Sequence, residues 1–137
     1  MLIFVWIFLS IKENLMTEVD RIQKVVHIYI DSMENSDPEK VRQAFHANAK
    51  VVGYLHGDFV ELSTEDFAGF VASQQPSPKE KNENIIFDIL SCDIEGTIAS
   101  VKIRDQYLGI TFLDILSLIK HENEWKIYNK LFHVESE

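Results

Sequence analysis

The sequence predicts an α+β fold in which helices cover one face of an antiparallel sheet. Helical periodicity of apolar residues dominates the first half of the chain, and strand-like alternation dominates the second half. Such a separation of helices from strands is typical of α+β domains. At 137 residues the chain fits one domain, which is long enough to form a core without disulfide or metal support.

Three helices are expected before the sheet is complete. The first begins after Thr17, which forms a capping box with Asp20. A second starts in "NSDPEKVRQAFH" with Pro38 in its first turn, and a third follows a cap at Ser63 or Thr64. The buried stripe of the first helix is expected to contain Ile22, Val26, Tyr29 and Met33.

The strands are predicted from alternating apolar residues and turn signals. The segment "AKVVGYLHGDFVEL" indicates a strand, a turn and a short return strand. The polar, proline-containing "QQPSPKEKNEN" is a loop, and the strands after it turn at "DIEGT". Two last strands, over residues 109–120 and 125–134, are joined by "HENE". These later strands are expected to form an antiparallel meander.

The first 15 residues form an apolar extension that precedes the expected domain at residues 16–137. The apolar run is short for a membrane-spanning helix, and it lacks the basic flank and cleavage site of a signal peptide. We favour a natural start at Met16, with residues 1–15 as upstream sequence. A membrane anchor is the alternative.

Composition excludes several classes of function. The formal net charge is −9, with the basic residues scattered, which argues against binding nucleic acid or an anionic membrane. The single cysteine, Cys92, cannot form an intrachain disulfide, and this favours a cytoplasmic location. The sequence has no zinc-ligand spacing, Gly-rich nucleotide motif, GxSxG or HExxH. We therefore expect no metal and no cofactor.

Three segments carry a resemblance to a known superfamily: "YIDSMENSDPEKVRQAFHANAKVVGY", "LSTEDFAGFVA" and "FLDILSLIKHENEWKIYNKLFH". They resemble the cone fold of nuclear transport factor two and its relatives, which include ketosteroid isomerase and polyketide (SnoaL-like) cyclases. The lumazine-binding-like group is the most similar. The resemblance implies a curved sheet with three helices on its concave face, a pocket between them, and a homodimer. It does not imply a particular reaction.

An acidic residue in the apolar strand "TFLDILSLIK" is the main candidate for chemistry. If "HENE" closes a tight hairpin, Lys120 pairs with Trp125, and Asp114 lies opposite Leu131. Asn129 and His133 are then diagonal neighbours of Asp114 inside the cone, whereas Lys126 and Lys130 face outward. A carboxylate beside His133 would allow acid–base catalysis near neutral pH. The alternative is a structural polar network that fixes the register of the strands.

Other residues are candidates for the pocket because they lie in phase with inward-facing positions. Asp105 and Tyr107 end one strand, and Tyr29 lies in the middle of the first helix. The expected catalytic pair is Asp114 and His133, and the expected ligand-binding residues are Tyr29, Tyr54, Asp105, Tyr107, Phe112 and Asn129.

The sequence leaves three functions open. We favour a protein that binds a small, largely apolar molecule. The first alternative is a cofactor-free isomerase, dehydratase or cyclase that uses an Asp/His pair for proton transfer. The second is a dimerisation module with a filled cone, which an open cavity would exclude.

Overall fold

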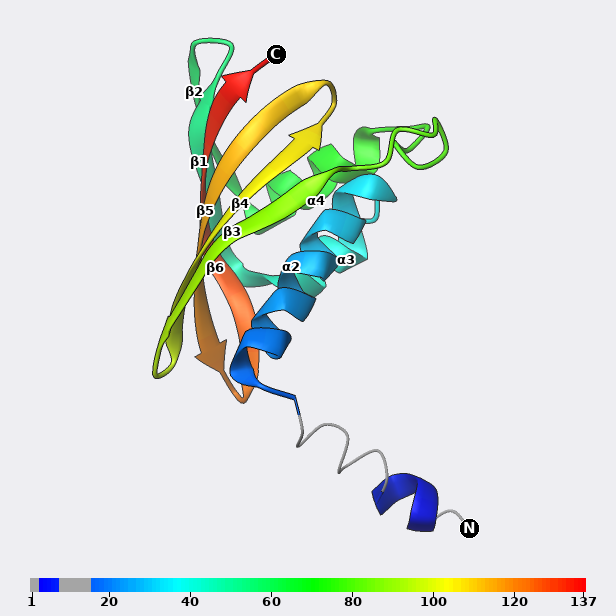
Figure 1. Cartoon of the computed structure of the whole chain (residues 1–137). Helices are drawn as coiled ribbons and strands as arrows, with labels where there is room; N and C mark the ends of the chain where they lie inside the picture. Colours follow the sequence, from blue (N-terminus) through cyan, green and yellow to red (C-terminus); the bar gives the residue numbers. More distant parts are fainter. Residues whose placement is uncertain (1–2, 8–15) are drawn as a thin grey trace.

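The structure, a computed structural model, describes residues 3–7 and 16–137. It confirms the predicted α+β class, with helices on one face of a curved six-stranded sheet (Figure 1). The helices and the sheet diverge toward the end that holds β2 and the loop after α4, which gives the domain its cone shape (Figure 1).

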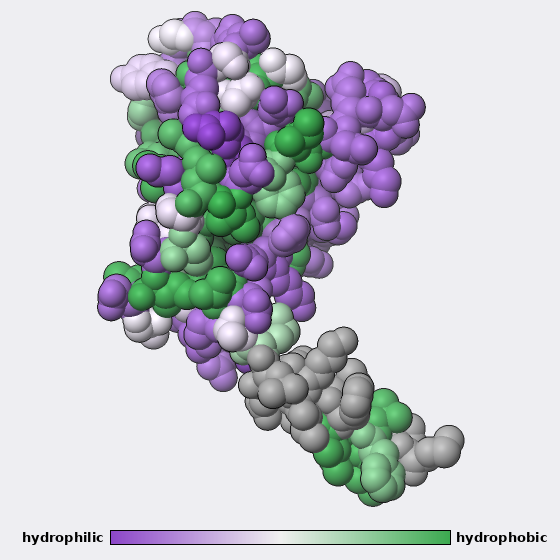
Figure 2. Space-filling model, in the orientation of Figure 1, coloured by the Kyte–Doolittle hydropathy of each residue, from purple (hydrophilic) through white to green (hydrophobic). Residues whose placement is uncertain are grey.

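Only residues 3–7 of the predicted extension over residues 1–15 are described. They are helical, and their apolar side chains are exposed (Figure 2). Residues 1–2 and 8–15 lie outside the described residues, so the predicted start at Met16 stays a prediction. Within the described ranges, no helix has both the length and the hydropathy needed to cross a membrane.

The predicted helix starts are confirmed at the capping residues. Thr17 Oγ1 accepts a hydrogen bond from the Asp20 backbone N–H, and the Asp20 side chain accepts one from the Thr17 backbone N–H. Ser63 and Asp66 form the same capping box. Asp37 caps the middle helix ahead of Pro38. The helices are α2 (Glu18–Glu34), α3 (Pro38–Ala44) and α4 (Thr64–Ser73).

The sheet has the strand order β2-β1-β6-β5-β4-β3. Every neighbouring pair is antiparallel except β1 and β6, which are parallel. The parallel pair joins the first hairpin to the last strand of the meander, so the first and last strands of the domain lie side by side. The strands are β1 (Phe45–Leu55), β2 (Asp58–Ser63), β3 (Phe87–Glu95), β4 (Ile98–Tyr107), β5 (Ile110–His121) and β6 (Glu124–Ser136).

The register of the β5–β6 hairpin differs from the prediction beyond its first residues. Lys120 pairs with Trp125 as predicted, but Asp114 pairs with Phe132 and not with Leu131. The register shifts by one residue because β6 bulges at Tyr128. Such an insertion exchanges the two faces of a strand. Lys130 therefore points inward, and the prediction that it faces outward is wrong.

Candidate functional site

A polar cluster lies in the interior between α2 and the sheet. The Tyr29 hydroxyl of α2 donates a hydrogen bond to Asp114 Oδ2 of β5 over 2.8 Å. Lys130 Nζ of β6 lies 3.9 Å from the same oxygen. Asp114 is fully buried, so these two groups replace the water that would otherwise stabilise its charge. A helix and two neighbouring strands therefore meet at one carboxylate oxygen.

The position of α2 is fixed at its N-terminal end. The Glu18 carboxylate accepts hydrogen bonds from Trp125 Nε1 and Lys120 Nζ, which belong to β6 and β5. These hydrogen bonds, the one from Trp125 foremost, lower the pKa of Glu18. The contacts tie the helix to the same hairpin that carries Asp114 and thereby hold Tyr29 over the sheet.

Asp105 of β4 supplies a second buried carboxyl group. Ile103 pairs with Asp114, and Asp105 lies two residues farther along β4, so the two acids are diagonal neighbours on one face. Burial and the negative charge of Asp114 raise the pKa of Asp105 to about 9. Asp105 is therefore protonated at neutral pH.

A proton shared by the two carboxyl groups accounts for their burial. Asp105 Oδ2 and Asp114 Oδ1 are buried, and neither accepts a hydrogen bond from an N–H group or a hydroxyl group among the described residues. A hydrogen bond between the two side chains adds to the raised pKa of Asp105. One proton on the pair leaves a single negative charge, which Lys130 faces. The cluster is thus close to neutral overall.

The ammonium group of Lys130 is surrounded by aromatic rings. Its Nζ lies 4.7 Å from the centroid of the Tyr29 ring, 4.8 Å from that of Phe67 and 6.0 Å from that of Phe132. The side chain is only 8% exposed. Ring faces attract a cation, and more strongly where water is excluded. The rings and Asp114 together offset the cost of burying this charge.

The cluster forms the polar part of an interior cavity of about 240 Å³. Asp105, Tyr107 and Lys130 line the cavity, and every other lining side chain is apolar. The Tyr107 hydroxyl is buried and has no hydrogen-bond partner among the described residues. Burial raises its pKa, so the hydroxyl keeps its proton. Among the apolar lining residues are Leu62, Phe67, Phe112 and Phe132.

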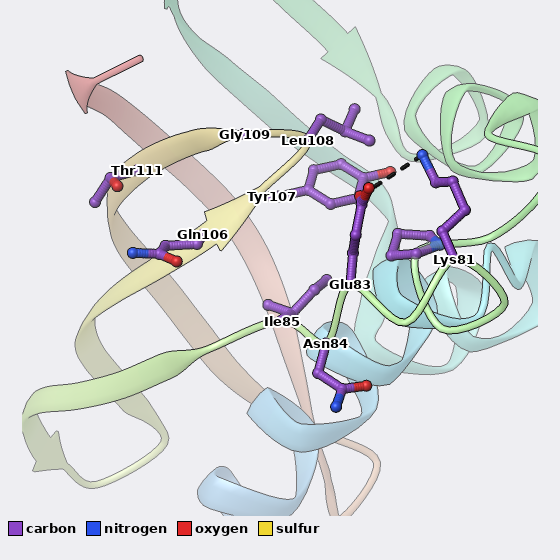
Figure 3. Close-up of a pocket in the computed structure, with 10 residues that line it drawn as sticks. Lys81, Glu83, Asn84, Ile85, Gln106, Tyr107, Leu108, Gly109 and Thr111 are labelled. Atoms are coloured by element: carbon purple, nitrogen blue, oxygen red, sulfur yellow. Dashed lines mark ion pairs between the residues drawn. The ribbon is translucent and has the colours of Figure 1, made fainter.

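A more polar groove of about 610 Å³ adjoins the cavity at Tyr107 and Leu108, which line both spaces. Lys81 and Glu83 come from the loop after α4 and form an ion pair of 3.6 Å (Figure 3). The Tyr107 ring lies beside this pair, between the loop and the β4–β5 turn (Figure 3). The cavity is therefore apolar inside and polar at the neighbouring surface.

The sequence profile of the family described as "Putative lumazine-binding" matches residues 17–133. The chain belongs to this family. The match confirms the resemblance drawn from the sequence and covers every residue of the polar cluster.

Proteins with a similar sequence or structure agree with this family assignment. The chain is 21% identical over 117 residues to "Aldolase FrzH" of Cladobotryum sp, covering 85% of this chain and 91% of the relative. An NTF2-like protein of unknown function from Silicibacter pomeroyi aligns with a TM-score of 0.78 and 22% identity, covering 88% of this chain and 100% of that one. One from Methylobacillus flagellatus aligns with a TM-score of 0.76 and 25% identity, covering 89% and 97%.

The structure brings together five of the residues predicted for the site. Asp105, Tyr107 and Phe112 line the cavity, and Tyr29 and Asp114 lie directly behind its polar wall. Asp114 points toward the helices, as its place in an apolar strand predicts. Their catalytic or ligand-binding roles stay predictions.

Three predicted residues lie elsewhere. Tyr54 is 66% exposed and packs on the Phe59 ring. Asn129 pairs with Ser117, which is exposed on the outer face, and His133 is itself exposed there. The predicted grouping of Asn129 and His133 with Asp114 is wrong because the bulge in β6 reverses the faces of the strand.

Lys130 occupies the diagonal position beside Asp114 that the prediction gave to Asn129, and it is the ionic partner of Asp114 that His133 was expected to be. Sequence reasoning missed it because a lysine in an alternating strand is normally assigned to the exposed face. The available signal was the buried acid itself, since an ionised carboxylate in an apolar strand requires a cation or a proton nearby.

Proposed function

We propose that the chain binds a small, largely apolar molecule that carries a carbonyl oxygen, and that it does so in the interior cavity. The observation that carries the proposal is the chemistry of the polar lining. Tyr107 and Lys130 are hydrogen-bond donors in an otherwise apolar wall, and protonated Asp105 beside them carries no charge. A ligand that matches this wall offers a hydrogen-bond acceptor on a hydrocarbon frame.

Charge balance favours a neutral acceptor over an anion. Asp114 already faces the Lys130 ammonium, so a carboxylate in the cavity would lie near a negative charge, and the described lining residues offer no second cation to offset it. A carbonyl oxygen accepts from the same donors at no such cost. The cavity of about 240 Å³ is smaller than the ~300–1,000 Å³ of typical drug-sized sites, which limits the ligand to a compact molecule. An open cavity also disfavours a filled dimerisation module.

A second candidate is a cofactor-free enzyme that acts on such a carbonyl compound by proton transfer. Asp105 and Asp114 hold one proton on two carboxyl groups, so the pair is able to protonate a carbonyl oxygen or to accept a proton from the adjacent carbon. The relative named an aldolase favours carbonyl chemistry of this kind. The predicted Asp/His pair is replaced in this proposal by the two acids.

The test compares cyclohexanone with methylenecyclohexane, which has nearly the same shape and no oxygen. Binding of each to the full chain is measured by NMR titration, in the wild type and in Tyr107→Phe. Loss of one donor should weaken ketone binding about fivefold, which corresponds to a net hydrogen bond of about 1 kcal/mol, and leave hydrocarbon binding unchanged. Because the Tyr107 hydroxyl has no hydrogen-bond partner within residues 3–7 and 16–137, the substitution leaves no described group unpaired.

A matched pair of variants locates the binding. Val60 lines the cavity, whereas its neighbour Phe59 is exposed on the other face of β2. Val60→Trp should abolish binding of both probes, and Phe59→Trp should not. Equal loss of ketone and hydrocarbon in Tyr107→Phe, or unchanged binding in Val60→Trp, contradicts the proposal.

We also propose that the chain acts as a cytoplasmic homodimer. The outer face of the sheet exposes the apolar residues Ile98, Ile115, Tyr128 and Leu131, and patches of this kind are typical of interfaces. Cys92 is a free thiol, which suits a reducing compartment. Analytical ultracentrifugation should give a dimer for the wild type and a monomer for Leu131→Glu. A monomeric wild type refutes the assembly.

A further inference from the structure

Lys130 differs from the other lysines that the structure describes. Its side chain is 8% exposed, whereas the lysines in surface ion pairs are at least 25% exposed. Its Nζ makes no hydrogen bond within the described residues, and its carboxylate partner is 3.9 Å away. It lines the apolar cavity directly. A primary amine is therefore aimed at the space assigned above to a carbonyl ligand.

We propose that Lys130 forms a Schiff base with a small apolar aldehyde or ketone bound in the cavity. The inference rests on the proposed function, because it needs a carbonyl group in that space. It goes further by assigning a covalent step to a residue of β6 and by restricting the ligand to aldehydes and ketones, which condense with an amine to form a C=N bond. Esters and amides do not form a C=N bond in this way and are excluded as ligands of the covalent step.

The step begins with removal of a proton from the ammonium group. Lys130 Nζ gives a proton to Asp114, which leaves a neutral amine at the cavity wall and a neutral acid directly behind it. The amine lone pair attacks the carbonyl carbon, and the carbonyl oxygen takes a proton from Asp105 to give a carbinolamine. The nitrogen of this adduct passes its proton to the Asp105 carboxylate as it becomes neutral.

Dehydration completes the reaction. The carbinolamine hydroxyl takes the proton that Asp114 holds and leaves as water, while the nitrogen lone pair forms the C=N bond. Asp105 ends protonated and Asp114 ends ionised, as both began. In the net reaction an ammonium ion and a carbonyl compound become an iminium ion and water. The total charge does not change, and no oxidant or reductant is needed.

The surroundings of Lys130 suit the product as well as the free lysine. The iminium carries the same positive charge at the same nitrogen, so Asp114 remains its counter-ion. The rings of Tyr29 and Phe67, within 4.8 Å of the nitrogen, attract an iminium as they attract an ammonium ion. The apolar wall also limits the water that would hydrolyse the C=N bond.

The test is reductive trapping on the full chain. The protein is incubated with cyclohexanone and sodium cyanoborohydride, digested, and mapped by mass spectrometry for lysines that carry a cyclohexyl group. Lys126, on the same strand and 25% exposed, serves as the internal reference. Lys130 should be modified at least about tenfold faster than Lys126, since the cavity holds the ketone next to its amine. The map uses the wild-type protein and so does not depend on the folding of a variant.

Two variants identify the cause of the labelling. Val60→Trp, which fills the cavity, should reduce modification of Lys130 to the level of Lys126, and Phe59→Trp should leave the ratio unchanged. Modification of Lys126 and Lys130 at equal rates, while NMR shows cyclohexanone in the cavity, overturns the inference and leaves the proposed function standing. Absence of cyclohexanone from the cavity overturns both.

Discussion

Replacement of Asp105 by asparagine should change how stability depends on pH. The folded chain keeps the Asp105 proton up to about pH 9, whereas the unfolded chain releases it near the ordinary value of 3.8. Between these limits each pH unit lowers the free energy of unfolding by about 1.4 kcal/mol. An asparagine amide does not titrate and still donates to Asp114 as the protonated acid does.

The variant should therefore gain stability relative to the wild type as pH rises. From pH 5 to pH 8 the difference in unfolding free energy should grow by about 4 kcal/mol in favour of Asp105→Asn. Urea denaturation at each pH, followed by circular dichroism, measures it. The exposed Asp93 of β3 provides the control, because Asp93→Asn should show no such slope. A constant difference between wild type and Asp105→Asn over this range would refute the claim that Asp105 is protonated.

Three further substitutions test the packing around the cluster. Tyr29→Phe removes the hydrogen bond to Asp114 and should lower the free energy of unfolding by about 1–3 kcal/mol in urea; an unchanged midpoint would count against the bond. Lys130→Met leaves Asp114 without its cation and should cost about 3–5 kcal/mol at neutral pH, most of it recovered in the double variant with Asp114→Asn. Gly53→Ala places a methyl group 2.5 Å from the Phe132 carbonyl oxygen and should cost about 1–3 kcal/mol, whereas Gly69→Ala, in open space on α4, should not destabilise.

Local signals were sufficient to predict the elements of the fold. The helix caps at Thr17 and Ser63 and the turn after Leu55 each form within four residues. The local sequence is therefore enough to predict them. Alternation in β4 likewise predicted that Asp105 and Tyr107 share the inner face with Val101 and Ile103. These features depend only on the spacing of residues along the chain.

The arrangement of the polar cluster depended on structural features that the spacing of residues in the sequence does not reveal. The bulge at Tyr128 has neither a glycine nor a turn motif that would signal it, and it reversed the faces of β6 from Asn129 to Val134. The parallel pairing of β1 with β6 joins segments about 80 residues apart and follows from the closure of the whole sheet. The bulge in β6 turned Lys130 into the site and turned His133 out of it.

The central claim, that the cavity offers hydrogen-bond donors to a carbonyl oxygen, is tested most directly by vibrational spectroscopy. Isotope-edited infrared difference spectra of cyclohexanone labelled with ¹³C at the carbonyl report the environment of that oxygen in the bound state. We predict one narrow band shifted below the frequency in alkane solvent, and a smaller shift in Tyr107→Phe. A bound ketone whose carbonyl band matches that in alkane would contradict the account.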